Sequence, residues 1–203
     1  MYLPARTPAL VRSVFPGKIW SFPTSEKEIY LTFDDGPIPE LTPWVLEQLD
    51  RFNAKATFFC VGDNAEKHPE ILREVLRGGH SVGNHTFNHL HGWKTPGNIY
   101  LRNVLKAGFL LKTQLFRPPY GKLSLQQYNA LKNHYKIVMW SVLTKDYDRN
   151  TTQEQCLQRS LQSRPGDIVL FHDNVKARKN LEYALPRFLE HYAGKGFVFR
   201  AIA

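Results

Sequence analysis

Short apolar segments alternate with longer amphipathic segments along most of the 203-residue chain, and this alternation constrains the fold more than any other feature. Several apolar segments lack strict polar alternation, which is typical of parallel strands covered on both faces. The predicted strands are residues 29–33, 56–61, 80–83, 115–116, 136–142, 167–171 and 197–202. Seven strands separated by helices predict a parallel α/β fold, either a barrel or an open doubly wound sheet. In both, functional sites lie at the carboxyl ends of the strands.

Local signals place helices between these strands. Thr42 is a predicted N-cap with Pro43 at the first helical position. Pro69 is predicted to open a second helix, and Thr152 with Gln155 has the spacing of a capping box.

Composition restricts the class of protein. The net charge of +9 comes from basic residues spread along the chain, so it favours anionic partners without indicating a nucleic-acid groove. No apolar stretch approaches the roughly 18 residues of a transmembrane helix, and two cysteines are too few for a zinc cluster or a disulfide framework. Residues 1–16 lack the apolar block of a secretory signal, so we expect a cytoplasmic protein, the alternative being an export signal trimmed from the chain.

The first predicted strand ends in two adjacent carboxylates, Asp34 and Asp35, followed by Gly36 and Pro37. Neighbouring side chains diverge, so one carboxylate can bind a cation while the other faces a substrate. The alternative is a solvated turn, which is common for this composition.

The third predicted strand is followed by His85 and His89. Two histidines four residues apart on a helical turn can bind one metal ion, although such a pair is often accidental. Neutral imidazoles with one carboxylate suit zinc, and three protein ligands leave a position for water.

Two further strands end in candidate functional residues. Arg117 and Tyr120 flank two prolines that stiffen the loop, and His172 lies at the tip of the sixth predicted strand. Each motif by itself is weak evidence. Because all of them fall at the carboxyl ends of predicted strands, we expect them to meet on one rim.

In combination, residues 32–37, 85–89, 117–120 and 170–172 resemble the motifs of the polysaccharide deacetylases with NodB homology, carbohydrate esterase family 4. The resemblance implies a distorted (β/α)7 barrel in a catalytic domain over residues 29–203. Residues 1–28 are then an N-terminal extension that packs on the barrel.

The resemblance also implies a role for each motif residue. Asp34 is the catalytic base, and Asp35, His85 and His89 bind a divalent metal. Zinc is the first choice for this ligand set, with cobalt and nickel as alternatives.

Four more residues take their roles from the same resemblance. Arg117 pairs with the base, and the backbone N–H of Tyr120 helps to bind the oxyanion. His172 is the general acid, and Leu170 lines the acetyl pocket.

The fourth family motif, Asp-x-x-Asp-Trp, is altered here. Asp146 keeps the position of the aspartate that orients the acid, whereas Leu143 replaces the other aspartate and Tyr147 stands at the tryptophan. The catalytic set is therefore expected to be intact, while the acetyl pocket, where we place Tyr147, differs.

The sequence thus predicts a metal-dependent hydrolase that removes N-acetyl, or O-acetyl, groups from a sugar or polysaccharide. The alternative is a metal-binding carbohydrate-recognition module with reduced or lost activity, although mere binding requires neither Asp34 nor His172. We expect a carbohydrate substrate, no nucleic-acid partner, no membrane span and a monomer.

Overall fold

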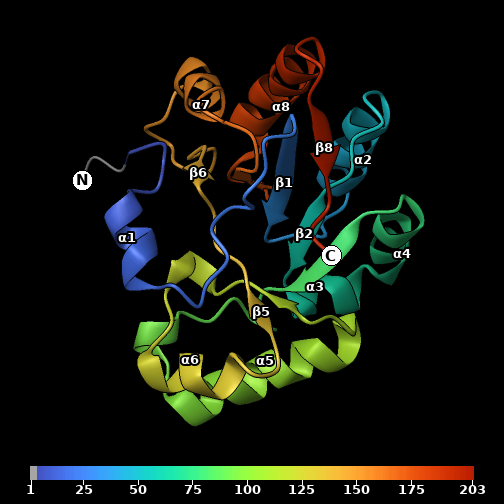
Figure 1. Cartoon of the computed structure of the whole chain (residues 1–203). Coiled ribbons are helices and arrows are strands. Elements are labelled where there is room, and N and C mark those ends of the chain that lie inside the picture. The colour runs from blue at the N-terminus through green and yellow to red at the C-terminus, as the bar shows by residue number, and fades with distance from the viewer. Residues whose placement is uncertain (1–3) are drawn as a thin grey trace.

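Eight parallel strands form one sheet in the computed structural model, which describes residues 4–203 (Figure 1). Seven follow in the order β5-β4-β3-β2-β1-β7-β6, and β8 pairs with β1. The strands are β1 (Glu28–Asp34), β2 (Thr57–Cys60), β3 (Ser81–Asn84), β4 (Leu115–Phe116), β5 (Lys136–Ile137), β6 (Val142–Leu143), β7 (Ile168–His172) and β8 (Val198–Arg200). This half-barrel confirms the predicted (β/α)7 class.

Strand β1 is the centre of the sheet. Tyr30 pairs with Ile168 of β7 on one side and with Arg200 of β8 on the other. From Thr32 onward, β2 replaces β8 as the partner, beginning with Thr57. Strand β1 is therefore covered at both edges along its whole length, and its buried pattern is the nearly continuous apolar one expected of a central parallel strand.

One predicted strand is wrong: residues 136–142 form the separate strands β5 and β6 at the two ends of the sheet order. Between them the chain also pairs with the N-terminal segment, while Val138 still donates to Phe116 of β4 and Ser141 to Ile168 of β7. Ile19 forms a bridge with Val138, and the backbone N–H of Thr7 donates to the carbonyl of Ser141 at 2.8 Å. The apolar pattern of residues 136–142 correctly predicts extended chain. It does not indicate that the two ends of this segment pair with different strands.

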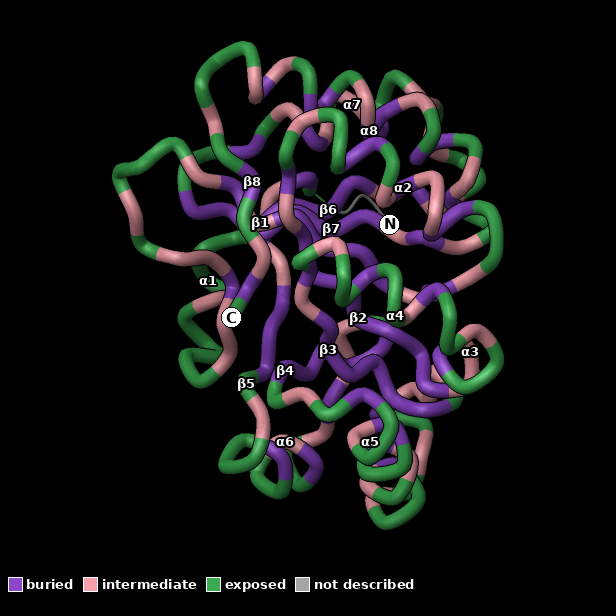
Figure 2. Tube along the Cα trace, turned by 90° about the vertical axis from the view of Figure 1, so that its right-hand side faces the viewer, coloured by how far each residue is buried: buried purple, intermediate pink, exposed green. Residues whose placement is uncertain are grey.

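Helices cover the outer face of the sheet, and the most buried part of the trace is the sheet itself (Figure 2). The α-helices are α1 (Ala9–Val14), α2 (Leu41–Asp50), α3 (Gly62–Lys67), α4 (Pro69–Arg77), α5 (Gly97–Leu111), α6 (Leu125–Leu131), α7 (Gln153–Ser160) and α8 (Arg178–Ala193). Two short 3₁₀ helices, η1 (Gly92–Lys94) and η2 (Pro119–Gly121), lie in the connections. No helix in the described residues is long and apolar enough to cross a membrane.

The capping predictions have mixed outcomes. The capping box of Thr152 and Gln155 is present, and Pro69 is the first residue of α4. The predicted cap at Thr42 is wrong, because α2 already begins at Leu41. The Thr42 hydroxyl instead accepts a hydrogen bond from the backbone N–H of Ile38 and donates one to a buried carboxylate described below.

Truncating the centre of β1 should cost far more stability than the same change on the surface. Leu31 is fully buried in the largest apolar cluster, so Leu31→Ala should reduce the free energy of unfolding by about 2–5 kcal/mol. Leu125→Ala, at a residue that is 74% exposed, should change it by less than about 0.5 kcal/mol. Urea denaturation measures both, and equal effects would contradict the central position of β1.

Candidate active site

The parallel register brings the predicted residues to one rim. Asp34 is the direct neighbour of His172 across β1 and β7. Asn84 of β3 pairs with Phe116 of β4, so the next residues, His85 and Arg117, also lie side by side. Eight of the ten predicted site residues line a cleft of about 880 Å³: Asp34, Asp35, His85, His89, Tyr120, Tyr147, Leu170 and His172. The other two, Arg117 and Asp146, are fully buried behind it.

Arg117 holds Asp34 in place. One guanidinium nitrogen donates to Oδ1 of Asp34 at 2.7 Å and to Oγ1 of Thr32 at 2.8 Å. The other nitrogens donate to the carbonyls of Val138 and Met139. This charge-assisted contact fixes the Asp34 carboxylate in one orientation.

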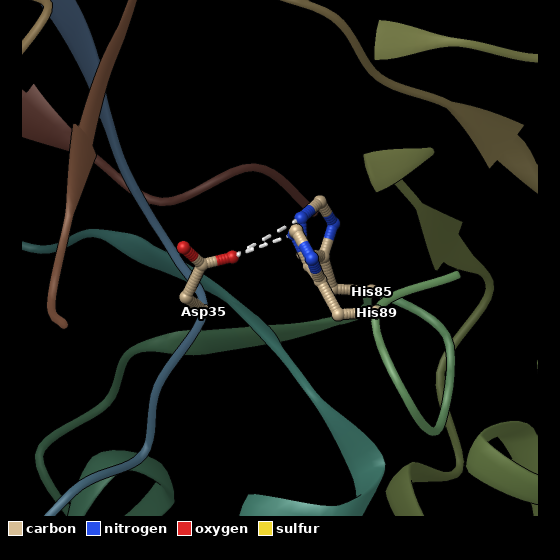
Figure 3. A group of neighbouring side chains, drawn as sticks. All are labelled: Asp35, His85 and His89. Carbon is tan, nitrogen blue, oxygen red and sulfur yellow. Dashed lines mark ion pairs between the residues drawn. The ribbon is translucent and has the colours of Figure 1, made fainter. Parts of the chain in front are cut away.

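Asp35, which follows β1, faces His85 and His89, which lie together on the segment that follows β3 (Figure 3). Oδ1 of Asp35 lies 3.0 Å from Nε2 of His89 and 3.5 Å from Nε2 of His85. That oxygen is buried and accepts no hydrogen bond from any described residue. A buried, charged oxygen without a donor is costly unless something else compensates it. One carboxylate and two imidazoles converging on such an atom fit a divalent cation.

The protonation states also suit metal binding. Burial lowers the pKa of His85 to about 4, so its ring is neutral near pH 7. Its Nδ1 lies 2.7 Å from the carbonyl of Arg117 and donates to it, which leaves the lone pair of Nε2 toward Asp35. Burial raises the pKa of Asp35, but the close contact with His89 and the charges of His172 and His85 outweigh it and hold that pKa well below its usual range.

Backbone conformations at the site are unusual. Asp35, Thr86, His89 and Tyr120 have positive φ angles of 84°, 63°, 54° and 60°. Left-handed conformations cost non-glycine residues free energy and persist where the surrounding structure enforces them. Their concentration around the converging side chains supports a functional role for this rim.

His172 and Asp146 form a second pair beside the first. Nδ1 of His172 lies 2.8 Å from Oδ1 of Asp146, and Oδ2 of Asp146 accepts the backbone N–H of His172 at 2.7 Å. Burial lowers the pKa of His172, but the charge and hydrogen bond of Asp146 outweigh it and raise that pKa to about 9. The imidazole is therefore protonated near neutral pH, with Nε2 free of the Asp146 contact.

The altered fourth motif lies in the cleft wall. The Tyr147 ring packs edge-on against His172, with ring centroids 4.8 Å apart. Leu143 and Leu170 line the same wall. These three side chains form an apolar surface next to the imidazole.

Two residues directly after His172 belong to the site and were missed by the sequence analysis. Nδ2 of Asn174 donates to Oδ2 of Asp35 at 2.5 Å. Asp173 accepts hydrogen bonds from the backbone N–H of Gly36 and from Oγ1 of Thr42, and its burial raises its pKa to about 7. A Cβ on Gly36 would lie 2.0 Å from Oδ2 of Asp173, so only glycine fits there. Asp173 and Asn174 directly follow a predicted strand, and this position could have identified them as site residues from the sequence.

Comparison with known proteins agrees with this geometry. A family model described as polysaccharide deacetylase matches residues 22–137. A peptidoglycan-N-acetylglucosamine deacetylase of Bacillus cereus is 33% identical over 91% of this chain and 90% of its own. A chitooligosaccharide deacetylase of Azorhizobium caulinodans is 36% identical over 73% of this chain and 75% of its own.

A solved structure is similar over nearly the whole chain. It is a peptidoglycan N-acetylglucosamine deacetylase in complex with 4-naphthalen-1-yl-N-oxidanyl-benzamide, with a TM-score of 0.86 and 32% identity over 97% of this chain and 95% of that one. The fold and these matches define a carbohydrate-acting hydrolase of the (β/α)7 class. Within that class, the chain belongs to the polysaccharide deacetylase family, which has NodB homology.

Removing the carboxylate of Asp146 should change the titration of His172. In protein stripped of metal by a chelator, Asp146→Asn should lower the pKa of His172 from about 9 by roughly one to three units, because the adjacent negative charge is lost. NMR titration of the histidine rings measures this shift. Asp148→Asn, which removes a partly exposed carboxylate paired with Lys145, is the control and should leave the pKa of His172 unchanged.

The same raised pKa affects stability. The contribution of His172 to folding should be fully present below its unfolded pKa of about 6.5 and should be lost as the pH rises through about 9. A His172 pKa that is the same in wild type and Asp146→Asn would contradict both expectations.

Proposed function

We propose that this protein is a divalent-metal-dependent hydrolase that removes N-acetyl groups from a sugar or polysaccharide containing N-acetylglucosamine. The observation that carries the proposal is the buried Oδ1 of Asp35, which faces two histidines and accepts no hydrogen bond from the described residues, beside a second carboxylate fixed by Arg117. The relatives are deacetylases of peptidoglycan N-acetylglucosamine and of chitooligosaccharides, which supports the same class of bond here.

Asp35, His85 and His89 would hold the cation. A ligand set of one carboxylate and two neutral imidazoles favours zinc, and cobalt or nickel can also bind such a set. When bound, a divalent cation lowers the pKa of a coordinated water and polarises a carbonyl oxygen.

Asp34 is the proposed general base. Its Oδ1 is occupied by Arg117, whereas Oδ2 lies 3.7 Å from Nε2 of His85, on the side of the proposed metal ligands. Oδ2 is therefore the atom that takes the proton from the attacking water. Arg117 fixes the orientation of the Asp34 carboxylate and does not need to move during the proton transfer.

His172 is the proposed general acid. Its Nδ1 is held by Asp146, so Nε2 is the atom that delivers a proton to the departing sugar nitrogen. Because Asp34 and His172 are neighbours across β1 and β7, base and acid reach the same bond from adjacent strands. The raised pKa of His172 keeps the proton available at neutral pH.

The remaining groups would bind the acetyl group. Leu170 and Tyr147 would enclose the methyl, and the backbone N–H of Tyr120 would donate to the developing oxyanion. Tyr120 ends a loop stiffened by Pro118 and Pro119, which limits the conformational freedom of that N–H.

The altered fourth motif leaves a binding module without turnover as the second candidate. An assay of acetate release from a panel of acetylated sugars, with and without chelator and added metals, tests whether the protein is such a binding module. Acetate release that is lost with chelator and restored by zinc would exclude it. The cytoplasmic location and the monomeric state stay predictions.

Removing a metal ligand should abolish metal binding and turnover together. Asp35→Ala and His85→Ala should each lose bound metal, measured by elemental analysis. Full metal content in either variant would contradict the assignment.

The variant Asp34→Asn should distinguish the role of catalytic base from that of metal ligand. It removes the proton acceptor without removing a ligand, so metal should stay bound while kcat falls by about 100- to 10,000-fold. If Asp34→Asn loses metal and Asp35→Asn keeps it, the two roles are reversed.

Tyr147 should tune the acyl pocket. Tyr147→Trp restores the ring of the family motif, so the ratio of kcat/KM for acetyl over longer acyl groups should change by roughly tenfold. An unchanged ratio would mean that Tyr147 does not touch the acyl group.

A further inference from the structure

Two asparagine side chains contact Asp35 at different points. Nδ2 of Asn174 donates to Oδ2 of the Asp35 carboxylate at 2.5 Å, and Nδ2 of Asn64 donates to the Asp35 backbone carbonyl at 2.8 Å. Asn174 lies in the loop between β7 and α8, and Asn64 lies in α3. Both asparagines also line the catalytic cleft. Asp35 is therefore held at its side chain and at its main chain by two segments far apart in the sequence.

The amide of Asn174 can take only one orientation. Its Oδ1 accepts the backbone N–H of Ala177 at 3.0 Å. Because a backbone N–H can only donate, the amide oxygen must face Ala177 and the amide nitrogen must face Asp35. The donor to the Asp35 carboxylate is thus fixed before any ligand binds.

The contact with Asn174 leaves one oxygen of Asp35 for a cation. Oδ2 accepts the amide of Asn174, whereas Oδ1 faces His85 and His89 and accepts no hydrogen bond from the described residues. Figure 3 shows the second oxygen of Asp35 turned away from both imidazoles. Carboxylates that ligate a metal ion are themselves held by hydrogen bonds, which orient the ligating atom.

The charge of the donor matters as well as its position. Asn174 and Asn64 are neutral, whereas the neighbouring carboxylate, Asp34, is paired with the guanidinium of Arg117. A positively charged donor would repel a second cation and weaken the attraction of the carboxylate for it. A neutral amide orients Asp35 without reducing its negative charge. The two adjacent aspartates therefore have donors that suit a proposed base and a proposed ligand.

The main chain of Asp35 needs support because its φ angle of 84° lies in the left-handed region. Its backbone N–H donates to the carbonyl of Phe59 at 3.3 Å, and its carbonyl accepts the amide of Asn64. A left-handed conformation costs a residue with a side chain free energy and persists where surrounding contacts enforce it. Asn64 supplies one of these contacts.

The start of α3, which carries Asn64, also contacts the segment that carries both histidines. The backbone N–H of Gly62 donates to the carbonyl of Thr86 at 2.9 Å. Gly62 approaches Phe87 so closely that a Cβ would lie 2.6 Å from its ring. The start of α3 therefore fixes Asp35 relative to the two candidate imidazole ligands.

We propose that Asn174 and Asn64 are positioning residues of the metal site: Asn174 directs the Asp35 carboxylate so that Oδ1 alone is offered to the cation, and Asn64 fixes the main chain of Asp35 relative to the histidines. This inference rests on the proposed metal-dependent function. Both amides act through Asp35. They raise metal affinity, because a site that is arranged before binding loses little conformational entropy when the cation arrives.

Zinc affinity of protein stripped of metal by a chelator tests Asn174. In Asn174→Ser the hydroxyl can still accept the N–H of Ala177, but the side chain is too short to reach Asp35 as well. The zinc Kd, measured by competition with a chelator of known affinity, should rise by about 10- to 100-fold. At saturating zinc, kcat should fall much less than the affinity does, because the ligands and the proposed base and acid are all present.

Asn64→Ser tests the main-chain contact in the same assay and should raise the zinc Kd by about tenfold. Asn133→Ser, at an exposed asparagine beyond the end of α6, is the matched control and should leave the Kd unchanged. The melting temperature of each metal-free variant is measured in parallel. A lower melting temperature with the wild-type Kd in both site variants would show a purely structural role and would overturn the proposal.

Crystal structures of the metal-free wild type and of metal-free Asn174→Ser give a readout that does not depend on metal binding. In the variant, Oδ1 of Asp35 should no longer face His85 and His89 in a single conformation. A wild-type protein that binds no divalent cation would overturn the proposed function instead. The two metal-free structures then decide the inference: a displaced Asp35 carboxylate in the variant supports positioning by Asn174, and an unmoved one overturns it.

Discussion

The buried guanidinium of Arg117 is the interaction on which the site depends. It follows β4, reaches Asp34 and Thr32 on β1, and donates to two carbonyls of the segment between β5 and β6. The guanidinium also lies 4.1 Å from the centre of the Phe59 ring on β2. A fully buried cation is tolerated only when its donors are satisfied, and here two distant segments, β1 and the stretch between β5 and β6, must be in place to satisfy them. Folding of the half-barrel and positioning of the base are therefore one event.

Four aspartates lie within this rim, and each has different neighbours. These neighbours give each carboxylate a different chemical role. Asp34 is paired with a buried arginine, and Asp146 with an imidazole. Asp35 has one oxygen bonded by an amide and the other left without a donor. Asp173 has only neutral donors and a raised pKa, so it is suited to a structural role. One residue type thus provides the proposed base, the group that holds His172, a candidate metal ligand and a structural support.

The sequence by itself determined the class of fold and most of the site. Apolar segments alternating with helices predicted a parallel sheet, and the strand-end rule then placed Asp34, Asp35, His85, Arg117 and His172 on one rim. These predictions hold because they depend on local periodicity and on chain direction, which a sequence displays directly. The resemblance to the family motifs also predicted Asp146 and the altered Tyr147 as site residues. Asp146 contacts His172, and Tyr147 lines the cleft.

The tertiary structure alone decided the features that depend on distant partners. The apolar segment 136–142 divides into two strands because its first residues pair with β4 and its last with β7, while Ile19 and Thr7, more than 100 residues earlier in the chain, bond to the stretch between them. Thr42 does not cap a helix because a buried carboxylate 131 residues away offers its hydroxyl a stronger partner. Pairing, burial and electrostatic potential arise from contacts between segments far apart in the chain, so no local pattern could contain them.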